Sequence, residues 1–173
     1  PINILRVNDP PIIHMGKNLT TLEDQPLSVD GIIVTDSDIQ ETFECMVTLY
    51  LVAAHGDIIF GSTEGLHFSK GSNHKSEITI RGDISRANHA LSRLTFKPTK
   101  DWHGNAELFI NVSDAGCTGF GGEKFSEGAV GITVLPVDDH PIIYVNGKLP
   151  NLVVTEDVIT MEDSSVKLPI FRV

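Results

Sequence analysis

The 173-residue chain is poor in basic residues, aromatics and cysteine. It has 13 Lys and Arg against 23 Asp and Glu, which gives a formal net charge of -10. An acidic chain repels polyphosphate, so the electrostatic footprint of a nucleic-acid-binding protein is lacking. One Trp and two Tyr are also few for an aromatic platform that binds sugars. The composition therefore excludes nucleic acid as a partner and gives little support to a sugar site.

Long apolar runs and catalytic motifs are lacking as well. No stretch approaches the roughly 20 consecutive apolar residues of a membrane span. The seven histidines are scattered without a zinc-type spacing, and no Ser, His and Asp arrangement lies in a nucleophile elbow. The glycines at 119–122 precede a strand pattern rather than a helix, so they do not predict a phosphate loop. We therefore expect no enzyme and no membrane insertion by this chain.

The sequence contains an internal repeat. VNDPPII at 7–13 recurs as VDDHPII at 137–143, which is 130 positions later (Val137 against Val7). Two further echoes keep the same order: INI at 2–4 with ITV at 132–134, and LED at 22–24 with MED at 161–163. These echoes predict three parts: the last strand and linker of a preceding repeat at 1–9, a complete repeat at 10–137, and the linker and start of the next repeat at 138–173.

Both termini of the sequence have strand-like patterns. Residues 2–7 alternate apolar and polar side chains directly after Pro1, and residues 169–173 do the same at the other end. No initiator Met or signal-peptide pattern is present. We expect the chain to be a piece of a longer protein.

Between the echoes the pattern is mostly that of β-strands. Short apolar or alternating runs separated by turn residues are typical of an antiparallel β-sandwich, and they fall at 27–34, 43–53, 76–82, 92–97, 106–113 and 128–135. Residues 84–94 differ, because Ile84, Ala87, Leu91 and Leu94 have helical spacing, and Asp83 or Ser85 can serve as the N-cap. We expect an all-β fold with one short helix that covers an edge or end of the sandwich.

Many carboxylates lie in short clusters at strand ends and in linkers. Calcium requires about six to eight oxygen ligands, so several loops must converge on one ion. A single cluster is explained as well by the preference of Asp for turns. Taken together, the clusters favour metal, and their members are Asn8, Asp9, Glu23, Asp24, Asp36, Asp38, Asp101, Asp114, Asp138 and Asp139.

The order of several short motifs resembles that of a cadherin repeat. These motifs are EDQPL at 23–27, VTDSD at 34–38, VSDAG at 112–116 and ITVLPVDDHP at 132–141. The sequence is most similar to the cadherin-like tandem repeats of large surface adhesins, because residues 84–94 run into TFKP at 95–98 and WHG at 102–104. The resemblance covers the whole chain and implies a Greek-key β-sandwich of cadherin or immunoglobulin-like type.

The resemblance also implies a set of calcium ligands. Asn8, Asp9, Asp36, Asp38 and Asp114 match the ligands that face the preceding repeat, whereas Glu23, Asp138 and Asp139 match those that face the next one. Asp101 lies near a middle acidic motif that its neighbours do not match. The family linker has a further Asp where this chain has Arg6 and Pro136, so we expect one or two ions per junction rather than the full set.

The implied function is that of a Ca²⁺-binding module in a tandem extracellular array at the cell surface. It would mediate adhesion or form a calcium-stiffened stalk. Its partners would be the neighbouring repeats of the same chain, and another surface protein or the same protein on an apposed cell. Two alternatives remain: a carbohydrate- or ligand-binding sandwich that uses loops such as 116–126, and an accessory domain of a secreted enzyme.

The cysteines and two glycosylation patterns are consistent with an extracellular location. Cys45 and Cys117 predict either a disulfide or one buried and one exposed thiol, depending on whether their Cα atoms come within about 7 Å. Asn18-Leu19-Thr20 and Asn111-Val112-Ser113 fit the N-glycosylation acceptor pattern. Asn111 lies late in an expected strand, so Asn18 is the better acceptor of the two.

Overall fold

The computed structural model describes residues 2–39, 45–117 and 119–139. The chain divides into two compact units, residues 1–137 and residues 138–173. Of the second unit only 138 and 139 are among the described residues, so most of the expected start of the next repeat lies outside them. The helix and strands below all belong to the first unit.

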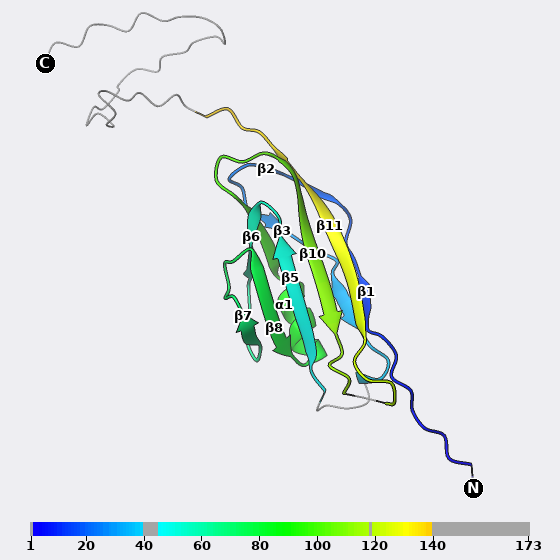
Figure 1. The fold of residues 1–173 in the computed structure, drawn as a ribbon. Coiled ribbons are helices and arrows are strands. Elements are labelled where there is room, and N and C mark those ends of the chain that lie inside the picture. Colours follow the sequence, from blue (N-terminus) through cyan, green and yellow to red (C-terminus); the bar gives the residue numbers. More distant parts are fainter. Residues whose placement is uncertain (1, 40–44, 118, 140–173) are drawn as a thin grey trace, which may run out of the picture. The chain divides into compact units, whose positions relative to one another are not determined.

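The larger sheet has six strands in the order β2-β11-β10-β5-β8-β7 (Figure 1). All neighbouring pairs in it are antiparallel except β2 and β11, which are parallel. The strands are β2 (Leu19–Leu22), β5 (Val47–Ala53), β7 (His67–Lys70), β8 (Glu77–Gly82), β10 (Gly104–Ser113) and β11 (Phe125–Leu135). Strands distant in sequence are therefore neighbours in this sheet.

Two smaller sheets contain the other strands among the described residues of the first unit. The order β3-β9-β6 forms a three-stranded antiparallel sheet, and β1 pairs with β4 in a two-stranded one. Their bounds are β1 (Ile12–His14), β3 (Leu27–Ser28), β4 (Ile33–Thr35), β6 (Gly56–Phe60) and β9 (Leu94–Pro98).

A single hydrophobic core joins the sheets. Alternate side chains of a strand point to opposite faces, and on β5 the residues Val47, Leu49 and Leu51 are fully buried while those between them are half-buried. The buried side chains of β9 and β6, including Phe96 and Ile58, belong to the same cluster. The described residues are mostly β with one helix and several sheets, which is consistent with the all-β sandwich that the sequence predicts.

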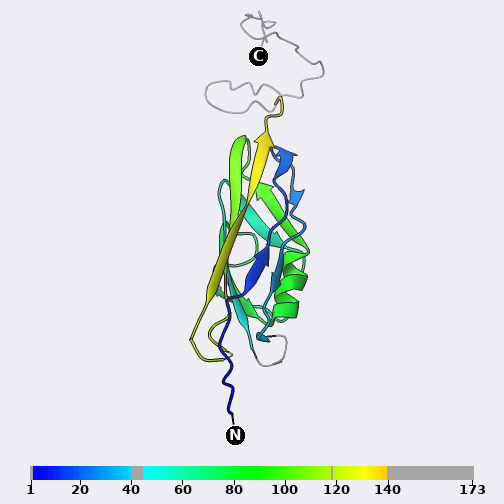
Figure 2. The same cartoon turned by 90° about the vertical axis from the view of Figure 1, so that its right-hand side faces the viewer.

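Helix α1 (Ile84–Leu91) confirms the expected helix, although it is shorter. Asp83 is its N-cap, because the carboxylate accepts a hydrogen bond of 2.8 Å from the Arg86 amide. Ala87, Ala90 and Leu91 are buried, and the helix packs beside β4 (Figure 2). Leu94, which the spacing assigns to the helix, instead begins β9 after the C-cap Ser92.

The expected strand at 27–34 is wrong as a single element. These residues instead contain β3 and the first part of β4, and the two strands belong to different sheets. Gly31 between them has a φ of +84°, which interrupts an extended strand. The sequence reading also missed β1, β2, β6 and β7, and residues 43–44 of its expected 43–53 strand lie outside the described residues.

Residues 2–6 form no strand within the described part of this chain, and the expectation that 1–9 hold the last strand and linker of a preceding repeat stays a prediction. Only Val7 makes a β-bridge, with Phe120, and Ile2 and Ile4 are 94% and 87% exposed. Their counterparts in the repeat alignment, Ile132 and Val134, are almost completely buried in β11. Alternation alone is not sufficient, because a strand also needs a neighbour to bind its backbone.

Candidate metal site

Three segments bring the expected leading ligands to one end of the first unit, called here the leading end (the lower end in Figure 1). Asp36 and Asp38 follow β4, and Asp114 follows β10. Asn8 and Asp9 precede β1, whose first residue Ile12 pairs with the last residue of β4, Thr35. The antiparallel register therefore places the start of β1 beside the end of β4.

Asn8 and Asp114 form the buried part of this cluster. Asn8 Nδ2 donates to Asp114 Oδ2 at 2.6 Å and to the Gly122 carbonyl oxygen at 2.7 Å. Asp114 Oδ1 accepts from the amides of Gly116 and Lys124 at 2.7 and 2.9 Å. Asn8 is 2% exposed and Asp114 is fully buried, so both side chains are fixed inside the protein rather than displayed on its surface.

Asp9 and Asp38 connect the linker to the segment after β4. The Asp9 amide donates to Asp38 Oδ2 at 2.7 Å, and the Asp38 amide donates to Asp36 Oδ1 at 2.9 Å. Asp9 is exposed and Asp38 is half-buried. The five residues expected at the leading junction are thus joined by hydrogen bonds into two groups, Asn8 with Asp114 and Asp9 with Asp38 and Asp36.

Asp36 is the residue that points to a cation. Its Oδ1 accepts from the amides of Asp38 and Ile39, but its Oδ2 is buried and has no hydrogen-bond partner among the residues that the structure describes. Burial raises the pKa of this carboxyl, and the Asp38 and Asp114 charges raise it further, against the lowering by the two backbone amides. A buried carboxylate oxygen without a donor is unfavourable. A cation beside it would remove that penalty, so the residues present fit a metal site.

The trailing end of the first unit, where β11 finishes, is arranged differently. Glu23 is 5% exposed, and its Oε1 accepts a hydrogen bond of 2.5 Å from the Val137 amide. Its own amide donates to the Leu135 carbonyl at 2.8 Å, and Glu23 Oε2 lies 3.9 Å from His103 Nδ1. Glu23 therefore extends the pairing of β2 with β11 beyond the last strand residue. Asp138 and Asp139 begin the second unit.

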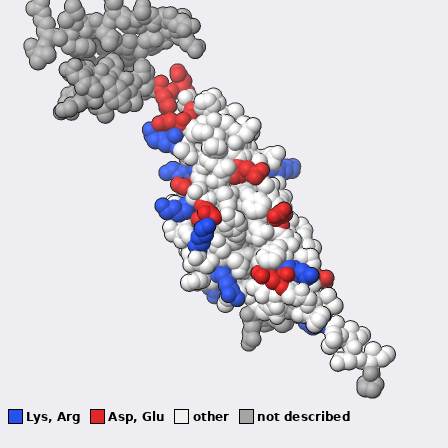
Figure 3. Space-filling view, in the orientation of Figure 1, with Lys and Arg blue, Asp and Glu red and all other residues white. Residues whose placement is uncertain are grey.

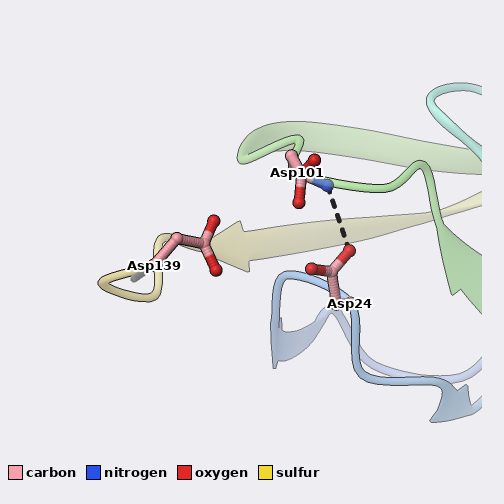
Figure 4. Close-up of side chains that lie close together, drawn as sticks. All are labelled: Asp24, Asp101 and Asp139. Atoms are coloured by element: carbon pink, nitrogen blue, oxygen red, sulfur yellow. Dashed lines mark hydrogen bonds between the residues drawn. The ribbon is translucent and has the colours of Figure 1, made fainter. Parts of the chain in front are cut away.

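Asp24 and Asp101 lie side by side in two loops of the first unit (Figure 4). The Asp101 amide donates to Asp24 Oδ1 at 3.0 Å, and Asp101 Oδ2 pairs with Lys100 Nζ at 3.0 Å. Both aspartates are exposed and have left-handed backbone, with φ of 60° and 55°. Asp139, also drawn in Figure 4, belongs to the second unit. The interactions of Asp24 and Asp101 with each other and with Lys100 are those of turn residues.

Cys45 and Cys117 form a disulfide, the first of the two alternatives left by the sequence. Their Cα atoms are 5.6 Å apart, across a sequence separation of 72. Cys45 lies two residues before β5, and Cys117 lies three residues after Asp114. The bond therefore joins the segment that carries Asp114 to the start of a central strand of the larger sheet.

The two glycosylation patterns differ in accessibility. Asn18 is exposed and its Oδ1 accepts from the Gly131 amide at 3.1 Å. Asn111 is half-buried within β10, and the hydroxyl of Ser113 in its motif is buried and bonded to Glu123. Asn18 is therefore the more accessible of the two, and glycosylation at either position stays a prediction.

The sequence reading missed Asn88, which supports the site from helix α1. Its Nδ2 donates to the Val34 carbonyl and its Oδ1 accepts from the Val34 amide, both at 2.8 Å. The Asn88 side chain thereby binds both backbone groups of Val34, as a neighbouring strand would. Val34 lies two residues before Asp36. An Asn among the apolar positions of a helix was the available signal, since such a side chain needs buried backbone partners.

No family model, no curated protein and no solved structure matches the chain. Its family is therefore not shown, and the site is interpreted from its own geometry. On the face drawn in Figure 3, acidic and basic side chains are interspersed. Among the described residues, no helix has the length and apolar character needed to cross a membrane.

Proposed function

We propose that the chain is a calcium-binding, cadherin-like β-sandwich module of a tandem extracellular array. The observation that carries this proposal is Asp36 Oδ2, a buried carboxylate oxygen without a donor in the part of the chain that the structure describes. It lies in a cluster whose neighbours Asp38 and Asp114 raise its pKa through their negative charge. Like charges held together in a protein interior favour either protonation or a bound cation.

The donor set favours Ca²⁺ among the common cations. Asn8, Asp36, Asp38 and Asp114 offer carboxylate and amide oxygens, which hard cations prefer, and the hydrogen bonds given above for these side chains involve no His or Cys side chain of the described residues. Calcium tolerates irregular geometry and ligands from several loops, whereas magnesium demands a near-ideal octahedron and retains water. Three converging loop segments therefore suit calcium better than magnesium.

A cation here would stiffen the linker. Asn8 and Asp9 precede β1, while Asp36, Asp38 and Asp114 belong to the sandwich. An ion shared by the linker residues and the sandwich residues would tie the linker to β4 and β10. Its positive charge would also cancel the repulsion between the carboxylates. That role suits a module in an adhesive array or a stalk, with neighbouring repeats and other surface proteins as its partners. The Cys45–Cys117 disulfide supports an extracellular location.

The arrangement of the sheets supports a Greek-key sandwich of cadherin type. The order β2-β11-β10-β5-β8-β7 places strands far apart in sequence beside one another, and β3, β9 and β6 lie in a separate sheet. Successive strands must therefore cross repeatedly from one sheet to the other. Such crossings, together with a parallel pair at the edge of the larger sheet, support this topology over a simple meander of hairpins.

Calcium titration of the oxidised chain, by calorimetry and by melting temperature, tests the proposal. The wild type should bind Ca²⁺ and melt at a higher temperature with it, because a ligand that binds only the folded state stabilises that state. Asp36→Ala combined with Asp38→Ala should abolish both effects. The matched control, Glu107→Gln with Glu127→Gln, removes two exposed charges from β10 and β11 and should keep both. An equal calcium response in wild type and the Asp36/Asp38 variant would overturn the proposal.

A further inference from the structure

The loop after β10 holds the linker through backbone contacts. We call residues 114–117 and 119–122 the clamp loop, and residues 6–8 the docked linker. The Phe120 amide donates to the Arg6 carbonyl at 2.8 Å, and the Asn8 amide donates to the Phe120 carbonyl at 3.0 Å. Val7 and Phe120 thereby form a parallel β-bridge. The Asn8 side chain adds its bond to the Gly122 carbonyl.

Gly119 allows this close approach. Its φ is +72°, and a Cβ at this position would lie 2.6 Å from the Asn8 backbone nitrogen and 2.8 Å from the Val7 carbonyl carbon. Backbone atoms of the docked linker cannot yield as the end of a flexible side chain would. Any residue with a side chain at 119 must therefore push the linker away from the clamp loop.

The clamp loop is itself fastened to the sandwich. Cys117 is bonded to Cys45, which is 3% exposed and lies just before β5. Asp114, fully buried, accepts from the amides of Gly116 and Lys124 and so binds both sides of the loop. These fastenings are a covalent bond and hydrogen bonds within the protein, so they require no cation.

The chain preceding the docked linker has a different environment. Ile4 and Leu5 are 87% and 71% exposed, whereas Asn8 is 2% exposed. Val7 is still 64% exposed, so the burial is confined to Asn8, whose amide and side chain are bonded to the Phe120 and Gly122 carbonyls. The clamp loop thus fixes Asn8 against the first unit, while Asp9 and Pro10 that follow it are exposed.

We infer that the disulfide-anchored clamp loop is a docking surface for the linker and holds residues 6–8 in place without any bound cation. The docked linker already forms part of the leading end in the metal-free chain. Asn8 is therefore bonded to Asp114 before an ion binds. Calcium would then act mainly on Asp9, Asp36 and Asp38. This inference concerns the metal-free chain and does not depend on calcium binding.

Amide hydrogen exchange of the oxidised chain in excess EDTA tests the inference. The amides of Asn8 and Phe120 should exchange at least ~10-fold more slowly than those of the exposed residues Ile4 and Leu5, after correction for intrinsic rates. Unprotected Asn8 and Phe120 amides in EDTA would overturn it. If calcium alone restored their protection, the clamp would be refuted while the proposed calcium function stood.

Two glycine variants make the test specific. Gly119→Ala should abolish the protection of Asn8 and Phe120, because the added methyl group would collide with Val7 and Asn8. Gly31→Ala is the matched control, since Gly31 lies outside the clamp loop, has a similar φ of +84°, and a Cβ added there would meet Gly16 Cα only at 3.4 Å, an ordinary contact, so the variant carries similar backbone strain without a clash with the linker. Equal loss of protection in both variants would contradict the inference. Retained protection in both variants would contradict it as well.

Discussion

The two ends of the first unit each bury an acidic side chain, but the two carboxylates differ in their hydrogen-bond partners. At the trailing end, Glu23 Oε1 receives the Val137 amide and Oε2 faces His103. At the leading end, Asp36 is as deeply buried, yet Oδ2 has no donor in the described part of the chain. Burial of a carboxylate is therefore not by itself a sign of a metal site, because backbone amides can satisfy it. The unpartnered oxygen distinguishes the two ends.

The ends also differ in how they are held. The leading end is joined covalently to the larger sheet through Cys45 and Cys117, the only two cysteines of the chain. The trailing end is held by hydrogen bonds, among them those of Glu23 with Leu135 and Val137. A cross-link is useful where like charges collect, since it opposes their tendency to separate. Three predictions test this contrast.

The largest effect is expected from removing the cross-link. Cys45→Ser combined with Cys117→Ser should lower the free energy of unfolding by about 4 kcal/mol, because a disulfide closing a loop of 72 residues restricts the unfolded chain. Chemical denaturation of the oxidised wild type and the double variant measures the difference. Reduced wild type should unfold like the double variant. If reduction leaves the wild type as stable as before, the disulfide does not contribute as proposed.

How far the sequence determines this arrangement depends on the kind of interaction. Strands of the core such as β5, β8 and β10 were predictable, because their alternation is long and apolar. Strands β1, β2 and β7 were not, since they are short and mostly exposed, and β2 also pairs with β11, which is distant in sequence. Residues 2–7 show the reverse case, a good local alternation without a neighbouring strand in the described part of this chain beyond the single bridge of Val7.

The leading carboxylates could be named from the sequence because Asp-x-Asp after one strand and Asp after another are local signals. The environment of these carboxylates could not be predicted from the sequence. That Asp114 is fully buried, that Asn8 binds it, and that Asp36 keeps one oxygen without a donor among the described residues all depend on which loops meet after folding. Asn88 and Gly119 were missed for the same reason, since each acts through the backbone of a segment far away in sequence.

A smaller effect is expected from the trailing end. Glu23→Gln keeps the size of the side chain and an oxygen that accepts from Val137, but it weakens a charge-assisted bond in a buried position. We expect a loss of about 1 kcal/mol in the free energy of unfolding at neutral pH, equal with calcium and with EDTA. Denaturation in both buffers measures it. A loss of stability confined to the calcium buffer would show that Glu23 is a calcium ligand rather than a residue that only holds the end of β11 through Leu135 and Val137.

An effect of similar size but opposite sign is expected for Asp36→Asn. The amide keeps an oxygen for the Asp38 and Ile39 amides but carries no charge, so it should relieve the burial penalty and the repulsion from Asp114. In EDTA at neutral pH the variant should be more stable than the wild type by about 1 kcal/mol, while losing the calcium response.

The pH dependence of this difference identifies its cause. Because burial raises the pKa of Asp36 above its ordinary value of 3.8, the folded wild type binds this proton more tightly than the unfolded chain does. The contribution of Asp36 to the free energy of unfolding is therefore fully present below pH 3.8, and it declines as the pH rises through the raised pKa. Melting curves in EDTA should nearly coincide for wild type and Asp36→Asn at about pH 4 and separate towards pH 7, with the variant higher. A variant that is less stable at neutral pH, as expected for Glu23→Gln, would mean that Asp36 is satisfied in the folded protein and that the two ends do not differ in the way described.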